Sequence, residues 1–311
     1  MNQSQQTAAQ PKLITVPINS FLRKKIPPPA LVLEPFLPER GLAMIHAETG
    51  VGKTHVALNM AYAVATGSSF LNWKAPEPRG VLYIDGEMAE VDLQMRLNQI
   101  AKVNGGKPKA TFKVCNIEQQ VGRGMPDISS REGQREVWDL ITDDIDLIVL
   151  DNLSTLSLGG KENESASWTC VQQWLLSMRA NGKTVLLVHH SGKNGQQRGT
   201  SKRTDVLNTV IDLRRPRDYT PEQGAAFEIH FTKARGVHGS EVKPIMARLN
   251  QESGWEWEPV EESTHQQIVN LFNEGLNQTE IARELEMNKS TVNRHIKRAQ
   301  NDGEIVRKEN K

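Results

Sequence analysis

The chain has 311 residues, of which 37% are hydrophobic and 24% are charged, and its formal net charge at pH 7 is +1. This composition is typical of a soluble globular protein, and no apolar run is long enough to predict a transmembrane helix. The near-neutral charge neither favours nor excludes a nucleic-acid partner, because binding depends on local charge. Only Cys115 and Cys170 are present. Two reduced thiols in a cytoplasmic protein are therefore favoured over a disulfide.

The first 26 residues are polar and then basic, and we expect them to form a flexible N-terminal segment. A run of three prolines, residues 27–29, then favours extended backbone. The sequence contains no apolar stretch behind its N-terminal charges that would indicate a secretory signal.

From residue 41 onward, short apolar runs that end in a polar residue alternate with segments of helical spacing. The apolar runs are residues 41–46, 80–85, 145–151 and 184–189, and the helical segments are 54–65, 90–102, 131–142 and 165–180. This alternation predicts an α/β domain with a doubly wound, mainly parallel sheet, whose ligands bind beyond the carboxyl ends of the strands. Three further stretches, 206–214, 226–233 and 242–249, alternate like antiparallel strands that extend the sheet, and residues 254–262 look like a strand end followed by a linker. We place this domain at residues 27–258.

The first apolar run leads into a phosphate-binding loop pattern, and a helix of small residues follows it. The glycines Gly50 and Gly52 let the loop turn its N–H groups toward phosphates, while Lys53 supplies charge to the β- and γ-phosphates and the Thr54 hydroxyl ligates Mg²⁺. The whole loop is predicted to hold Mg²⁺–ATP: Ala47, Glu48, Thr49, Gly50, Val51, Gly52, Lys53 and Thr54. Its first position carries Ala in place of the usual Gly.

Three other strand ends are expected to bring chemistry to the same edge of the sheet. Asp151 closes an apolar run, which predicts the acid that holds Mg²⁺ together with Thr54. The next residue is Asn152 rather than a glutamate, so the residue that orients the attacking water must come from elsewhere. We assign that role to Glu87, with Asp85 as the alternative.

His189 and His190 end the fourth strand, and either one is a candidate to contact the γ-phosphate. A metal site is disfavoured there, because no Cys, Asp or Glu lies at ligand spacing around the two histidines.

Taken together, the Pro-rich lead into GLAMIHAETGVGKT and the stretches VLYIDGEM, IDLIVLDNLSTL, TVLLVHHSGK and RGTS resemble the RecA-like hexameric ATPases. The resemblance is closest to the RepA-type plasmid replicative helicases and related phage and mobile-element ATPases of the AAA type, and it extends over residues 27–249. It implies a RecA-like fold, a catalytic glutamate after the second strand, and a hexameric ring with ATP between subunits. It also implies a basic finger that reaches into the neighbouring site, for which Lys233 and Arg235 are candidates and Arg198 is an alternative.

Residues 192–203 are rich in glycine, basic and free of acids. In the RecA-like class the corresponding loop faces the central channel and binds single-stranded DNA, so we expect Lys193, Lys202 and Arg203 to contact DNA. Because the loop has no aromatic residue for base stacking, its affinity would depend strongly on salt. A loop with no role in DNA binding is the alternative.

The last segment, residues 259–311, resembles a helix-turn-helix domain with helices at 264–272, 279–285 and 290–300. Its third helix is expected to bind duplex DNA, because Asn and Arg side chains can read base edges in the major groove. The candidate contacts are Lys289, Ser290, Thr291, Asn293, Arg294, Lys297 and Arg298. We expect residues 303–307 to add a small wing strand. The alternative is a helical bundle that binds protein.

The sequence therefore predicts a cytoplasmic, DNA-dependent ATPase that uses ATP and Mg²⁺, forms a homo-oligomer and acts in replication of a plasmid, phage or mobile element as a helicase. An ATP-switch regulator or loader that binds DNA without unwinding it is the alternative, and a nucleotide-regulated scaffold with little hydrolysis is a further one.

Overall fold

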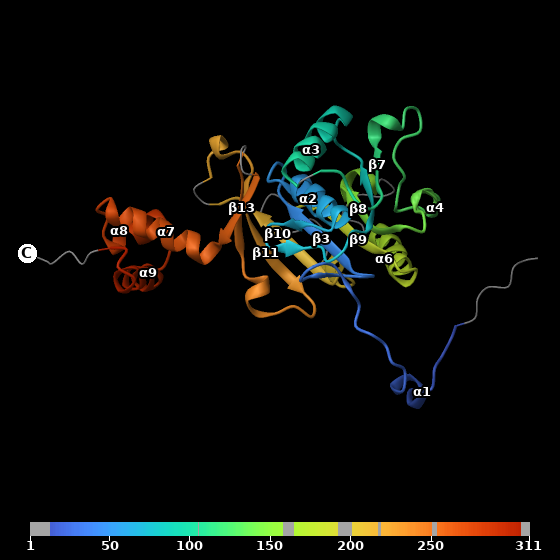
Figure 1. Ribbon diagram of the computed structural model, residues 1–311, viewed down its shortest axis with the longest axis horizontal. Coiled ribbons are helices and arrows are strands. Elements are labelled where there is room, and N and C mark those ends of the chain that lie inside the picture. Colours follow the sequence, from blue (N-terminus) through green and yellow to red (C-terminus); the bar gives the residue numbers. More distant parts are fainter. Residues whose placement is uncertain are drawn as a thin grey trace, which may run out of the picture.

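The computed structural model describes residues 13–104, 106–157, 165–191, 201–216, 219–250 and 254–305. Their centre is a nine-stranded sheet with the order β13-β12-β11-β10-β3-β9-β8-β6-β7 (Figure 1). In chain order the strands are β3 (Leu42–Ala47), β6 (Gly80–Asp85), β7 (Phe112–Asn116), β8 (Ile145–Asp151), β9 (Thr184–His190), β10 (Thr209–Arg214), β11 (Ala226–Ala234), β12 (Ile245–Asn250) and β13 (Gly254–Pro259). The six strands from β10 to β7 run parallel and the other three are antiparallel. The predicted α/β fold with a mainly parallel sheet is confirmed.

Helices cover both faces of the parallel part of the sheet, which explains its near-continuous apolar strands. On one face α2 (Lys53–Thr66) and α3 (Glu90–Val103) pack into a large apolar cluster. On the other face lie α4 (Arg131–Leu140), α5 (Leu153–Leu156) and α6 (Ser165–Ala180).

Strand β9 shows how successive residues divide between the two faces. Leu186 and Val188 belong to the cluster under α2, whereas Val185 and Leu187 belong to the cluster under α6. Because side chains alternate along a strand, the residues that follow must also point to opposite faces.

The N-terminal part contains a five-residue helix, α1 (Ile18–Leu22), that buries none of its residues and lies on an arm extending away from the body (Figure 1). The Pro-rich segment then leads into a small hairpin, β1 (Leu31–Leu33) and β2 (Leu37–Pro38), and a second short pair follows α2, β4 (Ser69–Phe70) and β5 (Trp73–Lys74). The side chains of Phe36 and Trp73 are buried, with their rings 4.8 Å apart. These residues complete the core on the α2 face.

Two edge strands differ from the sequence expectation. Strand β7 was not predicted, and β13 pairs along its whole length with β12 where a strand end and linker were expected. The antiparallel strand expected at 242–249 begins only at Ile245, because residues Gly239–Val242 form a 3-10 turn. Edge strands are half exposed, so their apolar pattern is weak.

The C-terminal helices α7 (Val260–Asn273), α8 (Gln278–Glu284) and α9 (Lys289–Asn301) surround a separate small core that includes Ile268, Ile281 and Ile296. Asn277 caps α8 by accepting hydrogen bonds from two backbone N–H groups. Helix α7 begins directly after β13, earlier than expected. Of the expected wing strand, residues 306 and 307 lie outside the described part of the chain. No helix in the described ranges is long and apolar enough to cross a bilayer.

Candidate active site

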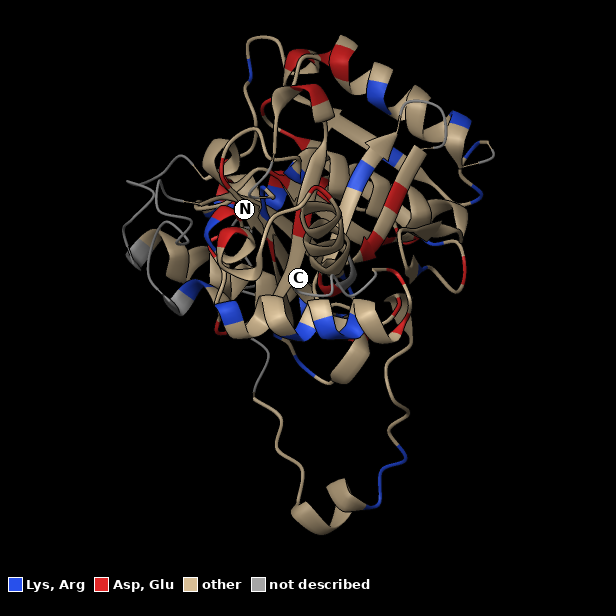
Figure 2. Cartoon of the chain, turned by 90° about the vertical axis from the view of Figure 1, so that its left-hand side faces the viewer, with Lys and Arg blue, Asp and Glu red and all other residues tan. Residues whose placement is uncertain are grey.

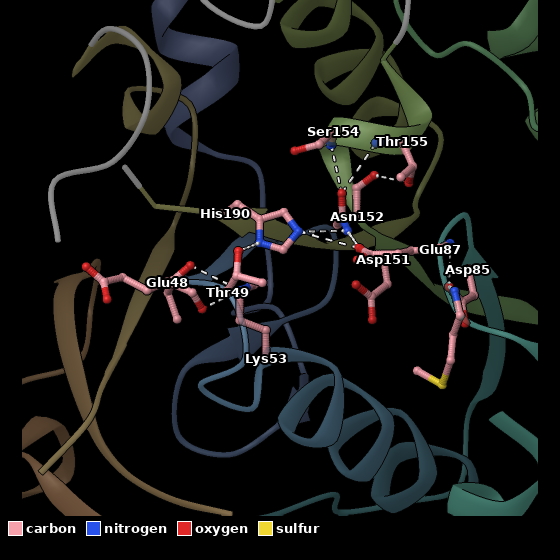
Figure 3. A network of polar contacts seen from close by, with 12 residues as sticks. Glu48, Thr49, Lys53, Asp85, Glu87, Asp151, Asn152, Ser154, Thr155 and His190 are labelled. Atoms are coloured by element: carbon pink, nitrogen blue, oxygen red, sulfur yellow. Dashed lines mark hydrogen bonds and ion pairs between the residues drawn. The ribbon is translucent and has the colours of Figure 1, made fainter. Parts of the chain in front are cut away.

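A cavity of about 590 Å³ opens at the carboxyl ends of four parallel strands, β3, β9, β8 and β6. Its walls include the glycine-rich loop after β3 and residues at the ends of the other three strands: Asp85, Glu87, Asp151, Asn152 and His190. Figure 3 shows these side chains converging from separate elements. The structure thus brings Lys53, Glu87, Asp151 and His190 around one cavity.

The loop adopts a backbone that requires its two glycines. Gly50 has a φ of 80° and Gly52 a φ of 132°. At Gly52 a Cβ would also lie 2.7 Å from the ring of Phe227, closer than packing permits. Helix α2 begins immediately afterwards, and no side chain caps its first N–H groups. An uncapped helix start behind such a loop can bind a phosphate through backbone N–H groups.

Lys53 is buried and folds back over its own loop. Its Nζ donates to the carbonyl oxygens of Ala47, at 3.0 Å, and of Glu48, at 2.8 Å. Burial lowers the pKa of Lys53 to about 8, against the opposing charges of Asp151 and Glu87. A phosphate in the cavity would offer this cation a stronger acceptor than the two carbonyls do.

Asp151 is the most deeply buried acid of the cavity. Its Oδ2 accepts a 2.7 Å hydrogen bond from the hydroxyl of Tyr83, and the hydroxyl of Thr54 also donates to its carboxylate. Burial nonetheless raises the pKa of Asp151 to about 6, and Asp85 and Glu87 add to that rise. A nearby cation would favour the charged form.

Thr54 and Asp151 together fit Mg²⁺. This ion takes one or two protein oxygens and completes its octahedron with waters and substrate phosphates. No cluster of three or more His, Cys, Asp or Glu side chains within the described ranges could hold a metal ion by itself. That agrees with a site in which the substrate supplies the remaining ligands.

Asp85 and Glu87 have different tasks in the turn after β6. The Asp85 side chain is buried, and its Oδ1 accepts hydrogen bonds from the N–H groups of Glu87 and Met88, at 2.9 and 3.0 Å. Burial raises the pKa of Asp85. The carboxylate of Glu87 is 57% exposed at the cavity rim. Asp85 therefore shapes the turn, and Glu87 is the acid that can reach a water molecule.

His190 lies beside Glu87 and the loop (Figure 3). Its Nε2 is 3.1 Å from Nδ2 of Asn152 and 3.5 Å from Oε2 of Glu87, and its Nδ1 is 3.4 Å from the hydroxyl of Thr49. Asn152 Nδ2 also donates to Glu87 Oε2. This side chain is in position to contact a terminal phosphate.

His189 does not line the cavity. As the alternation along β9 requires, its fully buried ring points to the α6 face, where Nε2 lies 3.0 Å from Nη1 of Arg203. The sequence left His189 and His190 as equal candidates for phosphate contact, and the structure does not support a direct contact by His189.

Arg203 is only 6% exposed, and its guanidinium lies over the ring of Trp168, 5.6 Å from the ring centre. The structure therefore does not support the prediction that Arg203 binds DNA, because its cation is enclosed by the domain core. Lys193 and Arg198 lie outside the described residues, and so does the side chain of Lys202.

The two cations proposed for the trans finger lie away from the cavity of their own chain. Lys233 Nζ donates to the carbonyl oxygens of Thr204, at 2.5 Å, and Asp205, at 3.2 Å, and Arg235 donates to that of Asp205 at 2.8 Å. Burial lowers the pKa of Lys233, as does the neighbouring Arg235. Both side chains hold the backbone just after residues 192–203.

Sequence reasoning missed three cavity-side residues. Arg96 of α3 and His55 of α2 line the cavity, and burial lowers the pKa of His55 to about 4, with Arg96 adding to the effect. Arg215 donates a 2.9 Å hydrogen bond to the carbonyl of Gly50 and lies over the ring of Tyr219. No local motif marks these positions. Only the place of Arg96 on the helix behind Glu87 could have indicated it.

The third helix of the C-terminal domain, α9, presents a basic face to solvent. Figure 2 shows Lys and Arg positions gathered along one helix of this domain. Among the predicted DNA contacts Thr291 and Asn293 are half-buried, and Asn293 accepts a hydrogen bond from Gln278. The remaining ones are exposed: Lys289, Ser290, Arg294, Lys297 and Arg298.

Two family profiles match the chain. One, described as AAA domain, matches residues 7–196, and the other, described as winged helix-turn-helix DNA-binding, matches residues 264–306. The first covers the phosphate-binding loop and all four strand ends of the cavity, and the second covers most of α7 and all of α8 and α9.

Solved structures support the fold. A KaiC-like protein from the archaeon Pyrococcus horikoshii is similar over 73% of this chain and 94% of its own, with 16% identity and a TM-score of 0.51. The flagellar accessory protein FlaH from Methanocaldococcus jannaschii aligns over 71% and 91%, with 15% identity and a TM-score of 0.47. No curated protein matches the sequence.

Proposed function

The chain belongs to the AAA domain family, and from that premise we propose that it is a DNA-dependent ATPase, a hexameric helicase or replication protein of the RepA type. The observation that carries this proposal is the meeting of Lys53, Glu87, Asp151 and His190 around one cavity, in a chain that also has an exposed basic helix α9. We assign the ATPase to residues 27–258 and the DNA-binding domain to residues 259–311.

The reaction is hydrolysis of the bond between the β- and γ-phosphates. Lys53 leaves the carbonyls of its loop and binds the β- and γ-phosphate oxygens, while the first N–H groups of α2 hold the phosphate chain. Mg²⁺ held by Thr54 and Asp151 neutralises charge on the same oxygens.

Glu87 orients a water molecule in line with the γ-phosphorus and takes its proton as the new P–O bond forms. ADP leaves with the bond electrons, and His190 contacts the departing phosphate. Because the carboxylate of Glu87 stands at the exposed rim, water reaches it without a conformational change.

The ring and its coupling to DNA rest on the resemblance to hexameric ATPases. In such a ring Lys233 and Arg235 would reach the γ-phosphate bound to the neighbouring subunit, with Arg198 as the alternative. Their hydrogen bonds to the carbonyls of Thr204 and Asp205 support a coupling role. Leaving those carbonyls for a phosphate would release the backbone that follows the loop at 192–203, which would bind single-stranded DNA through Lys193 and Lys202.

A regulator or loader that binds duplex DNA without unwinding it is the second candidate. The exposed face of α9, with Lys289, Arg294 and Lys297, favours it, since a motor that tracks single strands gains nothing from major-groove contacts unless they recruit it to an origin. Several copies in a ring would multiply weak duplex contacts.

Two measurements on the full-length chain separate these possibilities. The proposal expects ATP hydrolysis that single-stranded DNA stimulates, and strand displacement on a forked substrate that requires ATP. Turnover without displacement would favour the regulator or loader. Nucleotide binding with no phosphate release, with or without DNA, would exclude both in favour of a scaffold.

A further inference from the structure

Asn152, the residue between β8 and α5, has no role in the proposed reaction, yet it makes more polar contacts than its neighbours in the cavity. Its Oδ1 accepts hydrogen bonds from the backbone N–H groups of Ser154, at 2.9 Å, and Thr155, at 3.3 Å, and thereby caps α5. Those two donors fix the orientation of the amide, because only an oxygen can accept them. Nδ2 must therefore face the cavity.

The two hydrogens of Nδ2 have two acceptors within reach, Oε2 of Glu87 and Nε2 of His190. An amide nitrogen only donates, so Nε2 of His190 accepts and carries no proton. A neutral imidazole then bears its proton at Nδ1, which lies beside the hydroxyl of Thr49 in the phosphate-binding loop. The N–H of His190 is thus directed toward the loop and away from Glu87.

We infer that Asn152 is a positioning residue for ATP hydrolysis: it fixes the carboxylate of Glu87 and sets the tautomer of His190 that points an N–H donor at the γ-phosphate. The inference rests on the proposed ATPase function of the cavity. Asn152 itself exchanges no proton and touches no reacting atom. Its effect passes entirely through the two side chains that it holds.

The geometry also states what would happen without the amide. Nε2 of His190 lies 3.5 Å from Oε2 of Glu87, so a proton on Nε2 would be donated to that carboxylate. Glu87 would then lose an acceptor position that it needs for water, and His190 would lose its donor toward the phosphate.

The sharpest variant is Asn152→Asp, which keeps the shape of the side chain and the oxygen that caps α5 but replaces the donor by an acceptor. Asn152→Ser also keeps a cap and removes the amide. Asn277→Asp is the matched control, since Asn277 caps α8 in the same manner and lies in the C-terminal domain. All three variants are expected to fold.

The direct test is the tautomer of His190 in full-length protein labelled with ¹⁵N-histidine, read by long-range ¹H–¹⁵N correlation. The chain has eight histidines, and the spectrum of His190→Asn identifies the signal by its loss. We expect an Nδ1–H tautomer in the wild type and in Asn277→Asp, and a proton on Nε2 in Asn152→Asp. An Nε2–H tautomer in the wild type, or no change in Asn152→Asp, would overturn the inference.

Steady-state ATP hydrolysis gives the second reading. Both Asn152 variants are expected to lower kcat by about tenfold or more while KM for ATP changes by less than about threefold, because nucleotide binding does not depend on the amide. A wild-type kcat in either variant would overturn the inference. If the tautomer changes as expected but the wild type hydrolyses no ATP, the positioning by Asn152 stands and the proposed function fails.

Discussion

The hydroxyl of Tyr83 donates a 2.7 Å hydrogen bond to Oδ2 of Asp151, and both side chains are buried in neighbouring parallel strands. The bond offsets only part of the cost of burying this carboxylate, since the pKa of Asp151 remains raised to about 6. The cavity therefore keeps a carboxylate that a divalent cation would stabilise. Stability and cation binding consequently make opposite demands on this one residue.

Replacing Asp151 by Asn is expected to stabilise the nucleotide-free protein and to abolish Mg²⁺-dependent hydrolysis. With a folded-state pKa of about 6 against an ordinary 3.8, the folded protein retains a proton that the unfolded chain releases between these values. The cost of the buried charge therefore grows as the pH rises through this window, and is complete above pH 6 at about 3 kcal/mol.

Urea unfolding without nucleotide checks this prediction. The stability gain of Asp151→Asn is expected at pH 7 and should fall to about half at pH 5. Asp146→Asn, in the same strand near its other end, is the control and should change stability little at either pH. A destabilised Asp151→Asn protein at pH 7 would contradict the account.

Binding of ATP is expected to weaken as the pH rises above about 8. Burial lowers the pKa of Lys53 to about 8 in the nucleotide-free protein, so the cation is present below that pH and is lost above it. Because the phosphates bind only the charged form, the dissociation constant should rise about tenfold per pH unit beyond that point. Titration of a fluorescent ATP analogue from pH 7 to pH 10 measures this dependence. Lys53→Met should bind weakly at every pH, and a flat profile in the wild type would refute the assignment.

Binding of duplex DNA is expected to depend on the exposed cations of α9. Removing one phosphate contact with Arg294→Ala should weaken binding and reduce the slope of log affinity against log salt by about 1. Lys102→Ala, on the distant helix α3, removes the same charge and should leave both quantities unchanged. Fluorescence anisotropy of a labelled duplex at several salt concentrations measures both, and equal effects of the two variants would place the DNA elsewhere.

Much of the cavity could be predicted from the sequence, because the carboxyl ends of buried parallel strands meet at one edge of a sheet. Four apolar runs, each with a polar residue at or just after its end, are enough to bring Glu87, Asp151 and His190 toward the loop that carries Lys53. The glycine-rich loop is a local motif, and its backbone requirement is visible in the residues themselves.

The division of labour between His189 and His190 could not be predicted. Both faces of β9 are apolar, so the sequence does not tell which of two consecutive residues points to which face. The burial of Arg203 depends on Trp168, 35 residues earlier in the chain, and no local pattern reports such a contact. The position of Asn152 was noticed only as the lack of a glutamate, since its contacts with Glu87 and His190 join three separate strand ends.

The measurement that tests the central claim most directly is the rate of phosphate release by Glu87→Gln, compared with the wild type and with Glu90→Gln. Glu90 is an exposed acid in the first turn of α3, so its variant should hydrolyse ATP at the wild-type rate. Glu87→Gln should bind ATP normally and lose about 100-fold or more in kcat, because it can no longer accept a proton from water. Full activity of Glu87→Gln would contradict the account.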